Sequence, residues 1–494
     1  MEAIVTKDLK IKTCIMVNSI VGRKEEMEEL KRAQHSERPE FIAVYGRRRV
    51  GKTFLVKEFF GYSFDFYVTG TANLPMKPQL KLFYKAVLKY NTNPAFVPEI
   101  PVDWFDAFEL LEKVLEATPK KGKKIIFLDE LPWFDTPRSN FVQALEFFWN
   151  SYASTKNILL IVCGSSASWM IHRLIRSRGG LHNRLTSKIK MEPFDLAECA
   201  SFFKLRGAGF ENYQITQLYM ALGGVPFYLD LIDTTKSATQ NIHELCFKNK
   251  GKLLDEFSEL YSSLFKNPGQ HLAIIRALSS KRKGLTRMEL LNITKLPDAG
   301  STSKVLKELI ESGFVKEYLP FGARKKNGLF QLVDFFSLFH LNFMEDPDNL
   351  EKKDWILSLD DPTKRAWSGY AFEMVCMQHI RQIKKAMGIG SVQTNSSSWI
   401  GENNSKGCQI DLLIDRRDDV INLCEIKFSN NEFEISKKYA QDILSKAEVF
   451  KAATRTKKSI FVTFITPFGL KDNASSKLIV QKSLTLSDLF IQLS

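Results

Sequence analysis

The chain has 494 residues, of which 44% are hydrophobic, so it carries enough apolar material for several packed cores and wholesale disorder is excluded. Its 70 Lys and Arg residues against 56 Asp and Glu residues give a net charge of +14, which suits an acidic partner such as nucleic acid, although many soluble proteins are basic without one. The seven scattered cysteines form no CxxC pair, and no apolar run approaches the roughly 20 residues of a membrane span. We therefore expect a cytoplasmic protein of about three domains without disulfides, a zinc knuckle or a membrane segment.

The first part of the chain alternates short apolar runs with longer mixed segments. The runs predict buried strands at Phe41–Tyr45, Ser63–Val68, Lys124–Leu128 and Ile158–Cys163. Strands that alternate with helices favour a parallel sheet covered on both faces. We assign residues 1–235 to this α/β core, which ends near the helix-breaking turn Gly223–Pro226 and a small helical lid.

A phosphate-binding loop follows the first of these strands and opens a helix. It reads Gly46, Arg47, Arg48, Arg49, Val50, Gly51, Lys52, Thr53, a full GxxxxGK[ST] pattern. The glycines allow backbone N–H groups to turn toward phosphates, and the helix N-terminus adds positive potential. We expect the loop to bind ATP and Mg²⁺, with Lys52 on the β- and γ-phosphates and Thr53 on the metal.

Two carboxylates end the strand that begins at Lys124, which is the pattern expected of a second part of such a site. Asp129 at the strand tip can hold Mg²⁺ through water, and Glu130 can polarise the attacking water. The next apolar strand ends in Cys-Gly-Ser-Ser, where Ser165 is a candidate sensor of the γ-phosphate or, alternatively, a helix N-cap.

Arg184 lies before a strand-like stretch and is a candidate arginine finger, which would stabilise charge on the transferring phosphoryl group. Arg173, Arg176 and Arg178 compete for this role, and each of the four is alternatively a solvated charge. The sequence does not decide whether the finger acts in cis or in trans.

Residues 236–346 predict a helical linker and a winged-helix domain. Three helical patterns are followed by a hairpin around a basic turn, in the order His271–Ser279, Thr286–Asn292, Ser301–Ser312, Phe314–Leu319 and Gly328–Val333. The third helix carries Lys304 and Lys307 on its polar side, and the loops 281–283 and 324–326 are basic, so phosphate and groove contacts are expected. The alternative is a winged helix used as an intramolecular lid.

A polar linker at 347–361 precedes a separate α/β unit at 362–494. Its predicted elements are a helix at Ala366–Ile383, strands near Ser391–Thr394, Ile410–Asp415 and Val420–Lys427, a helix at Ile435–Ala452 and a strand at Ser459–Ile465.

Four charged residues of this unit fit a metal-dependent phosphodiester site. Glu373 lies in the helix, Asp411 in one strand, and Glu425 with Lys427 in the next, where the period of two places both on one face. A tight turn at 416–419 would bring Asp411 and Glu425 to one end of an antiparallel pair. Carboxylates hold Mg²⁺, which activates water, and the lysine offsets developing charge. Alternatively, the unit only binds its target and its site is inactive, or these are surface charges on an edge strand.

The ordered motifs resemble a known family over roughly residues 20–345. Val21-Gly22-Arg23, the phosphate loop, Leu128–Trp133, Cys163–Ser166, Asn183-Arg184 and Gly223–Pro226 are similar to the archaeal-type AAA-related ATPases, which resemble the signal-transduction ATPases with numerous domains and the archaeal origin-recognition ATPases. The resemblance implies that Gly22 and Arg23 lie near the adenine pocket. One departure is that no arginine follows Gly224 at the usual second sensor position.

Residues 362–470 resemble the PD-(D/E)xK nuclease fold, which is restriction-endonuclease-like, and the poorly characterised domain that ends many archaeal-type ATPases. Glu373, Asp411, Glu425 and Lys427 occupy its positions, and Gln441 on the next helix is an auxiliary candidate. The whole sequence therefore predicts an ATP hydrolase whose nucleotide state controls a nuclease-like domain acting on nucleic acid, most of all DNA, with further copies of the chain as partners. Alternatives are an ATP-driven DNA- or protein-binding switch with an inactive C-terminal domain, and an origin-binding initiator.

Overall fold

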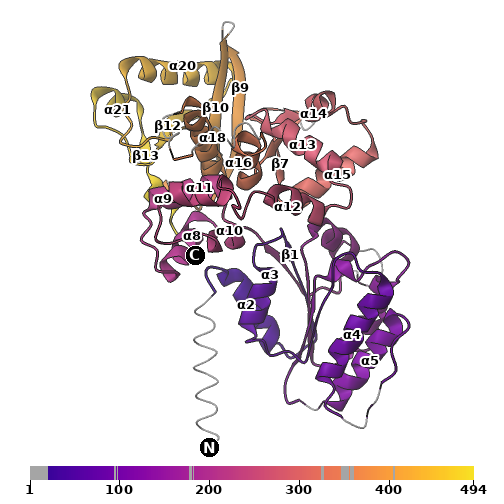
Figure 1. Ribbon diagram of the computed structural model, residues 1–494. Helices are drawn as coiled ribbons and strands as arrows, with labels where there is room; N and C mark the ends of the chain where they lie inside the picture. Colours follow the sequence, from indigo (N-terminus) through magenta and orange to yellow (C-terminus); the bar gives the residue numbers. More distant parts are fainter. Residues whose placement is uncertain are drawn as a thin grey trace, which may run out of the picture. The chain divides into compact units, whose positions relative to one another are not determined.

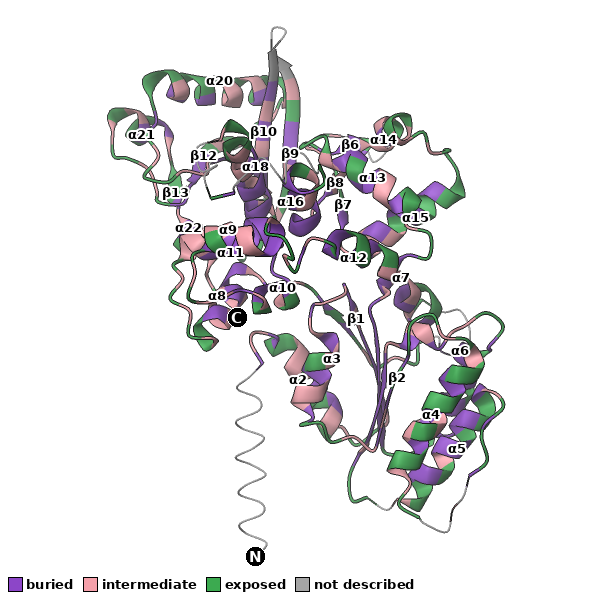
Figure 2. Ribbon diagram, viewed as in Figure 1, coloured by how far each residue is buried: buried purple, intermediate pink, exposed green. Residues whose placement is uncertain are grey.

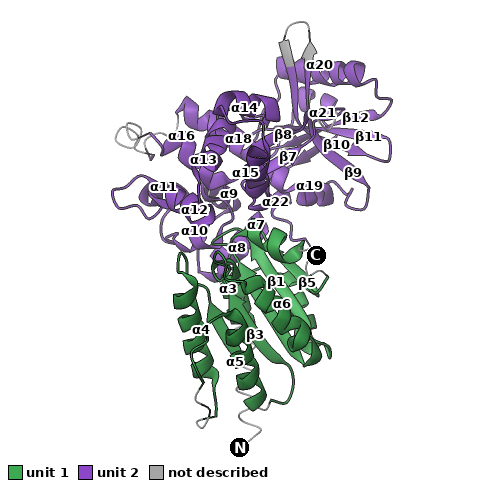
Figure 3. Cartoon of the chain, turned by 90° about the vertical axis from the view of Figure 1, so that its right-hand side faces the viewer, with its two compact units in different colours: residues 1–193 green, residues 194–494 purple. Residues whose placement is uncertain are grey.

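A computed structural model describes residues 20–493 except 94–95, 97, 119, 177–180, 182, 324–326, 347–354, 357–360 and 404–405, and describes no side chains in 402–407. The chain forms two compact units, residues 1–193 and 194–494 (Figure 3). The division falls after Pro193, so the helices that follow the first sheet cluster with the C-terminal part of the chain.

Unit 1 contains the parallel sheet that the sequence predicts. Five strands are hydrogen-bonded in the order β2-β3-β4-β1-β5, all parallel: β1 (Glu40–Gly46), β2 (Phe66–Thr69), β3 (Lys124–Asp129), β4 (Ile158–Gly164) and β5 (Ser187–Met191). The prediction of a strand from Ser63 begins too early, because Gly61 and Tyr62 adopt positive φ angles of 57° and 59° and turn the chain before β2.

Helices cover both faces of this sheet, and alternate residues of β1 serve the two cores (Figure 1). Phe41 and Ala43 join one buried cluster, and Ile42 and Val44 join the other, as the strand period of two requires. The covering helices are α2 (Lys24–His35), α3 (Lys52–Phe59), α4 (Met76–Tyr90), α5 (Trp104–Ala117) and α6 (Phe141–Ser151). Figure 2 shows the buried strands and the solvent-facing sides of α4 and α5.

Short helical turns connect the remaining parts of unit 1. They are η1 (Leu131–Trp133), η2 (Ala153–Thr155), α7 (Ala167–Trp169) and the π-helix η3 (Met170–Ile175).

Unit 2 begins with a group of helices and then has the predicted order of three helices and a hairpin. The first group is α8 (Leu196–Leu205), α9 (Asn212–Leu222), α10 (Pro226–Asp230), α11 (Ala238–Cys246) and α12 (Glu256–Leu264). The second is α13 (Gly269–Ser279), β6 (Leu285–Thr286), α14 (Arg287–Thr294), α15 (Gly300–Glu311), β7 (Val315–Tyr318) and β8 (Leu329–Leu332), followed by α16 (Phe335–Phe343). The three strands form an antiparallel sheet in the order β6-β8-β7.

The last part of unit 2 is a mixed five-stranded sheet with helices. The strands lie in the order β13-β12-β11-β10-β9, and β9–β10–β11 is antiparallel while β11, β12 and β13 are parallel. Its strands are β9 (Thr394–Asn403), β10 (Lys406–Arg416), β11 (Val420–Ile426), β12 (Ser459–Ile465) and β13 (Lys482–Leu484). Its helices are α18 (Pro362–Gln378), α19 (Ile380–Ala386), α20 (Lys437–Thr454), α21 (Ala474–Ile479) and α22 (Leu486–Leu489).

Two predictions for this part differ from the structure. The strand expected near Ser391–Thr394 is β9, which begins at Thr394 and runs through a polar stretch that masks it in the sequence. The single helix expected at 366–383 is interrupted at His379, whose φ and ψ of −103° and 29° depart from helical values. Among the described residues, no helix combines the length and apolarity needed to cross a membrane.

Candidate functional site

The loop from Gly46 to Thr53 has the backbone conformation that a phosphate cradle requires. Gly46, Arg49 and Gly51 have positive φ angles of 143°, 71° and 88°. A Cβ atom on Gly46 would lie 2.2 Å from the Met191 carbonyl oxygen of the neighbouring strand β5, so only glycine fits there. The shape of the loop therefore depends on glycine at this position.

Lys52, the first residue of α3, is folded back into this loop. Its side chain is 5% exposed, and its Nζ donates to the Gly46 carbonyl at 3.1 Å and to the Arg47 carbonyl at 2.7 Å. Burial lowers the pKa of Lys52, because the charged form is less well solvated. An anionic phosphate in the loop would stabilise the ammonium group, which fits the predicted role of Lys52.

Thr53 and Asp129 meet although they lie on different elements. The Thr53 hydroxyl donates to both Asp129 carboxylate oxygens, at 3.0 and 2.9 Å. Burial, followed by the neighbouring Glu130 charge, raises the pKa of Asp129. A buried carboxylate beside a hydroxyl is a set of hard oxygen donors, so these residues fit a Mg²⁺ ion.

Glu130 and Ser165 come together because β4 lies between β1 and β3 and parallel strands end at one edge of the sheet. The Ser165 hydroxyl donates to Glu130 Oε2 at 2.8 Å, and the backbone N–H of Ser165 does so at 3.3 Å. The alternative role of Ser165 as a helix N-cap is wrong, since Ser166 occupies that position of α7 and makes no side-chain capping bond. The sequence did not reveal that Ser165 contacts the predicted catalytic carboxylate.

Gly22 and Arg23 directly precede α2, and Arg23 contacts the same loop. Both have positive φ angles, 63° and 55°. The Arg23 side chain is 5% exposed, and its Nη2 donates to the carbonyl of Val50 at 3.3 Å. Arg23 thus contacts the phosphate loop, and the place of Gly22 and Arg23 near an adenine pocket stays a prediction. Arg48 and Arg49 complete the loop.

Arg184 lies far from this loop within its own chain. It is exposed in the turn before β5, and two residues later Thr186 donates its backbone N–H to the carbonyl of Phe41 at the start of β1. The phosphate loop follows the other end of β1, roughly five residues or 16 Å further along at about 3.3 Å per residue. Arg173 pairs with Asp135 at 3.1 Å, and Arg178 lies outside the described residues.

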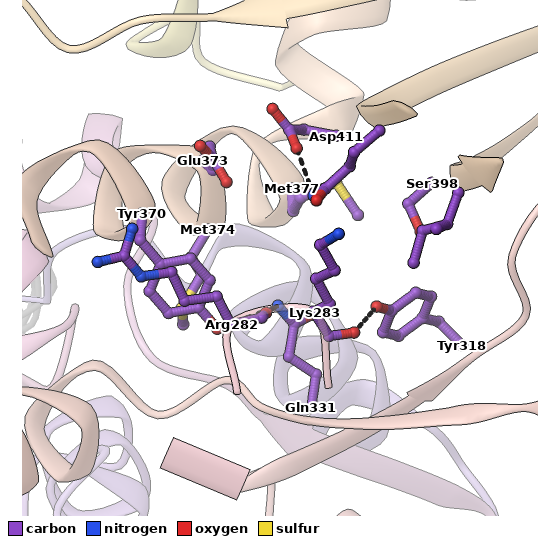
Figure 4. A pocket seen from close by; sticks show the side chains of 12 residues that line it. Arg282, Lys283, Tyr318, Gln331, Tyr370, Glu373, Met374, Met377, Ser398 and Asp411 are labelled. Carbon is purple, nitrogen blue, oxygen red and sulfur yellow. Dashed lines mark hydrogen bonds between the residues drawn. The ribbon is translucent and has the colours of Figure 1, made fainter. Parts of the chain in front are cut away.

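A second site lies in unit 2, where Glu373 of α18 and Asp411 of β10 line one open pocket (Figure 4). The pairing of β10 with β9 shifts register between Ile410 and Leu413, so two β10 residues lie opposite Ser398 alone. Such a bulge re-aims a side chain, and here it occurs at Asp411. Gln409 donates its Nε2 to Asp411 Oδ1 at 2.7 Å.

Both pocket carboxyls are shifted toward the neutral form. Burial and the nearby Asp411 charge raise the pKa of Glu373 to about 8. Burial and the Glu425 charge raise the pKa of Asp411. Close carboxylates in a poorly solvated site repel each other, and a cation between them would relieve that repulsion.

Glu425 converges with Asp411 as the sequence predicted, since Leu412 pairs with Cys424 and the two acidic residues follow on the paired strands. It is already neutralised, however: Lys427 Nζ lies 3.0 Å from its Oε1 and Lys446 Nζ lies 3.1 Å from its Oε2. Burial would raise the pKa of Glu425, but these two lysines and the Tyr439 hydroxyl outweigh it and lower that pKa.

Tyr439 and Lys446 were missed, and Gln441 is exposed on α20. Residues that are seven positions apart on a helix share a face, whereas residues two positions apart do not. The helical period therefore indicates that Lys446, and not Gln441, lies on the same face as Tyr439. Among the described residues, no group of three or more His, Cys, Asp or Glu side chains is arranged to hold a metal ion.

The sheet, the glycine-shaped loop, Lys52 and the paired acidic strand end define unit 1 as a P-loop nucleotide-binding ATPase. Residues 20–232 match the family described as an ATPase domain predominantly from Archaea. This stretch is thus similar to an archaeal-type ATPase domain, and the chain is an ATP hydrolase.

The chain is similar to three known proteins. An uncharacterised protein of Methanocaldococcus jannaschii, MJECL04, is 23% identical over 436 residues, which cover 87% of this chain and 92% of that protein. The uncharacterised ATP-binding protein MJ0423 of the same organism is 54% identical over 39 residues, 8% of this chain and 66% of that protein. The Walker-type ATPase PABY2304 of Pyrococcus abyssi is 19% identical, with a TM-score of 0.49 over 65% of this chain and 96% of its own.

Proposed function

We propose that the nucleotide state of unit 1 controls a metal-dependent, nuclease-like site in unit 2 that acts on nucleic acid, most of all DNA. In this proposal unit 2 contains a winged-helix domain and a restriction-endonuclease-like domain. The observation that carries it is the pocket that holds Glu373 and Asp411 together, with Glu425 and Lys427 on the adjacent strand.

In the ATPase site, Lys52 would bind the β- and γ-phosphates, while Thr53 and Asp129 would hold Mg²⁺. Glu130 would orient the attacking water, and Ser165 would keep the Glu130 carboxylate in place through its 2.8 Å hydrogen bond. When bound, Mg²⁺ neutralises charge that develops on the phosphates.

In unit 2, Glu373 and Asp411 offer the hard oxygen donors that suit Mg²⁺ or Mn²⁺, and their raised pKa values favour a cation at this place. A metal there supplies an activated water and a contact to the scissile phosphate. Lys427 would stand beside that phosphate. Glu425 would join as a ligand only when its bonds to Lys427 and Lys446 are exchanged for metal contacts.

The start of unit 2 is tied to the helix that carries Glu373, which supports a route for control. The backbone N–H of Leu196 donates to His379 Nε2 at 3.0 Å. Gln382 donates to Asp195 Oδ2 at 2.9 Å. These residues directly follow unit 1, so a displacement of this segment would pull on the end of α18.

The test incubates the full chain with ATP, Mg²⁺ or Mn²⁺ and labelled DNA and RNA, beside Lys52→Ala and Asp411→Asn variants. Cleavage by the wild type that Asp411→Asn abolishes supports the nuclease-like site. Loss of that cleavage in Lys52→Ala as well supports control by ATP. Hydrolysis of ATP without cleavage under either metal contradicts the proposed nuclease activity.

A second candidate function is an ATP-driven binding switch with an inactive C-terminal domain. The ion pairs of Glu425 with two lysines favour it, because they occupy a carboxylate that the metal site needs. Under this alternative, nucleic acid binds with an affinity that depends on ATP and is not cut, and Asp411→Asn leaves that affinity unchanged.

A further inference from the structure

The pocket that holds the two carboxyl groups has a basic wall from a different part of unit 2. Arg282 and Lys283 lie in the loop between α13 and β6 and enter the pocket opposite Glu373 and Asp411 (Figure 4). The Arg282 charge acts on Glu373, since it opposes the rise of the Glu373 pKa. The two basic side chains thus lie on the opposite side of the pocket from the carboxyl groups of Glu373 and Asp411.

The backbone of this basic loop is held in place by the small antiparallel sheet. Tyr318 of β7 donates its hydroxyl to the Lys283 carbonyl. Gln331 of β8 donates its Nε2 to the Arg282 carbonyl at 3.1 Å and to the Tyr370 hydroxyl at 3.2 Å. The loop is therefore positioned against α18, while both basic side chains remain exposed.

These two cations differ from their neighbour in the same loop. Lys281 forms an ion pair with Glu289 at 3.1 Å, outside the pocket. Within the part of the chain that the structure describes, Arg282 and Lys283 have no ion-pair partner, and Arg282 rests over the Tyr370 ring at 5.8 Å. A phosphate, which carries negative charge, is the ligand chemistry that would complete them.

The remaining lining mixes polar side chains, such as Gln331 and Gln409, with aromatic and apolar ones. Tyr318, Met374 and Ile400 also line the pocket, and Ile400 is 45% exposed. The hairpin is fixed to β9 beside it, because the backbone N–H of Phe321 donates to the Ser398 carbonyl at 2.8 Å. Tyr318 brings an aromatic ring into the pocket beside the two cations, and an unstacked base of a single strand can stack on such a ring, whereas the paired bases of a duplex cannot.

We infer that this pocket binds single-stranded nucleic acid, with Arg282 and Lys283 on a phosphate and Tyr318 and Ile400 against an unstacked base. The inference rests on the proposed function, because it names the substrate class of that same carboxylate site. The segment proposed as a winged helix then completes the pocket from within the chain.

The test measures binding of a labelled single-stranded oligonucleotide to the full chain by fluorescence anisotropy, with Ca²⁺ in place of Mg²⁺. Arg282→Ala and Lys283→Ala should each weaken binding about tenfold and reduce the salt dependence by about 0.7 in the slope of log K against log salt. Lys281→Ala is the matched control in the same loop and should bind like the wild type. Lys283→Arg should retain most of the affinity.

Two results would overturn the inference: unchanged binding in the Arg282→Ala/Lys283→Ala double variant, or a duplex of the same sequence that competes as well as the single strand. A loss of affinity in Lys304→Ala/Lys307→Ala without a loss in the pocket variants would also overturn it. Failure of the proposed function has a different signature, since the wild type would then cut nothing while the pocket variants still lost single-strand binding. Cleavage that is lost in Asp411→Asn but unchanged in Arg282→Ala and Lys283→Ala would contradict this inference and leave the proposed function standing.

Discussion

The hydrogen bond from Ser165 holds the half-buried Glu130 carboxylate directly after the end of β3. Ser165→Ala should lower kcat for ATP hydrolysis about tenfold while KM changes little, because positioning of a base acts mainly on the chemical step. A steady-state assay checks this, with Ser166→Ala as the control. Faster turnover in Ser165→Ala would contradict it and make the bond an inhibitory restraint.

The raised pKa of Glu373 has a consequence for stability. A folded-state pKa of about 8 lies above the ordinary value of 4.5, so the neutral carboxyl stabilises the fold at low pH and this contribution is lost as pH rises toward 8. Glu373→Gln stays neutral, so its free energy of unfolding relative to wild type should increase between pH 5 and pH 9. The increase should reach up to about 2 kcal/mol, because solvent screens part of the effect, and the difference in Tm should grow with it.

Calorimetry in EDTA across that pH range checks this expectation for Glu373. Glu317→Gln, at an exposed position of β7, is the control and should show a constant difference from wild type. A Tm difference for Glu373→Gln that does not change with pH would show that the carboxyl titrates normally.

At the scale of single residues, the groups of the candidate nucleotide site could be expected to lie together, because they are adjacent in the chain or end neighbouring strands. Gly46–Thr53 is one continuous segment. Asp129 lies near it as soon as the strands that precede both are parallel members of one sheet, because their carboxyl ends then share an edge. Lys446 was missed because its contact with Glu425 joins a helix to a strand 21 residues away. Arg282 could not be placed either, since its proximity to Glu373 depends on packing between segments with no shared pattern.

At the scale of elements, the turn at Gly223–Gly224 shows how closely α8 and the end of α9 approach. A Cβ atom on Gly224 would lie 1.8 Å from the Phe194 carbonyl oxygen, and the two residues share a backbone hydrogen bond of 2.7 Å. Gly224→Ala should therefore destabilise unit 2 by more than about 3 kcal/mol. Gly209→Ala, with no atom within 4 Å of its added Cβ, should change stability by less than about 0.5 kcal/mol.

Chemical unfolding followed by tryptophan fluorescence measures both glycine variants. Equal stability of Gly224→Ala and wild type would mean that the segment at Phe194 shifts without cost. This result would also weaken the proposed route of control, which relies on the same segment to displace α18.

Elements were predicted where apolar periodicity is strong and missed where it is absent. The fully buried β4 was placed almost residue by residue, whereas β9 begins with Thr394 and three serines lie in its first half. An edge strand buries one face only, so its hydrophobic signal is weak. At the interruption of the long helix, His379 makes two hydrogen bonds. One is a tertiary contact, from the Leu196 backbone N–H to its Nε2, and the other is local, between its Nδ1 and the Val375 carbonyl.

At the scale of the whole molecule, the position of Arg184 bears on assembly. It lies at the amino edge of the sheet, and the phosphate loop lies at the carboxyl edge, so Arg184 can act as a finger only on the ATP of a second copy. Arg184→Ala should then lower ATP hydrolysis by at least about a hundredfold without loss of ATP binding, and Lys52→Ala should abolish binding.

Mixing these two inactive variants separates action in trans from action in cis. In a mixed assembly, an Arg184→Ala subunit has an intact phosphate loop and receives Arg184 from its Lys52→Ala neighbour, so hydrolysis should reappear. Each variant alone, at the same total concentration, is the control. Because restored activity requires contact between copies, it should fall on dilution. If the mixture stays as inactive as its components while the wild type remains active at every dilution, action in trans is contradicted. An Arg184→Ala variant that hydrolyses ATP as fast as the wild type would show instead that Arg184 is a solvated charge.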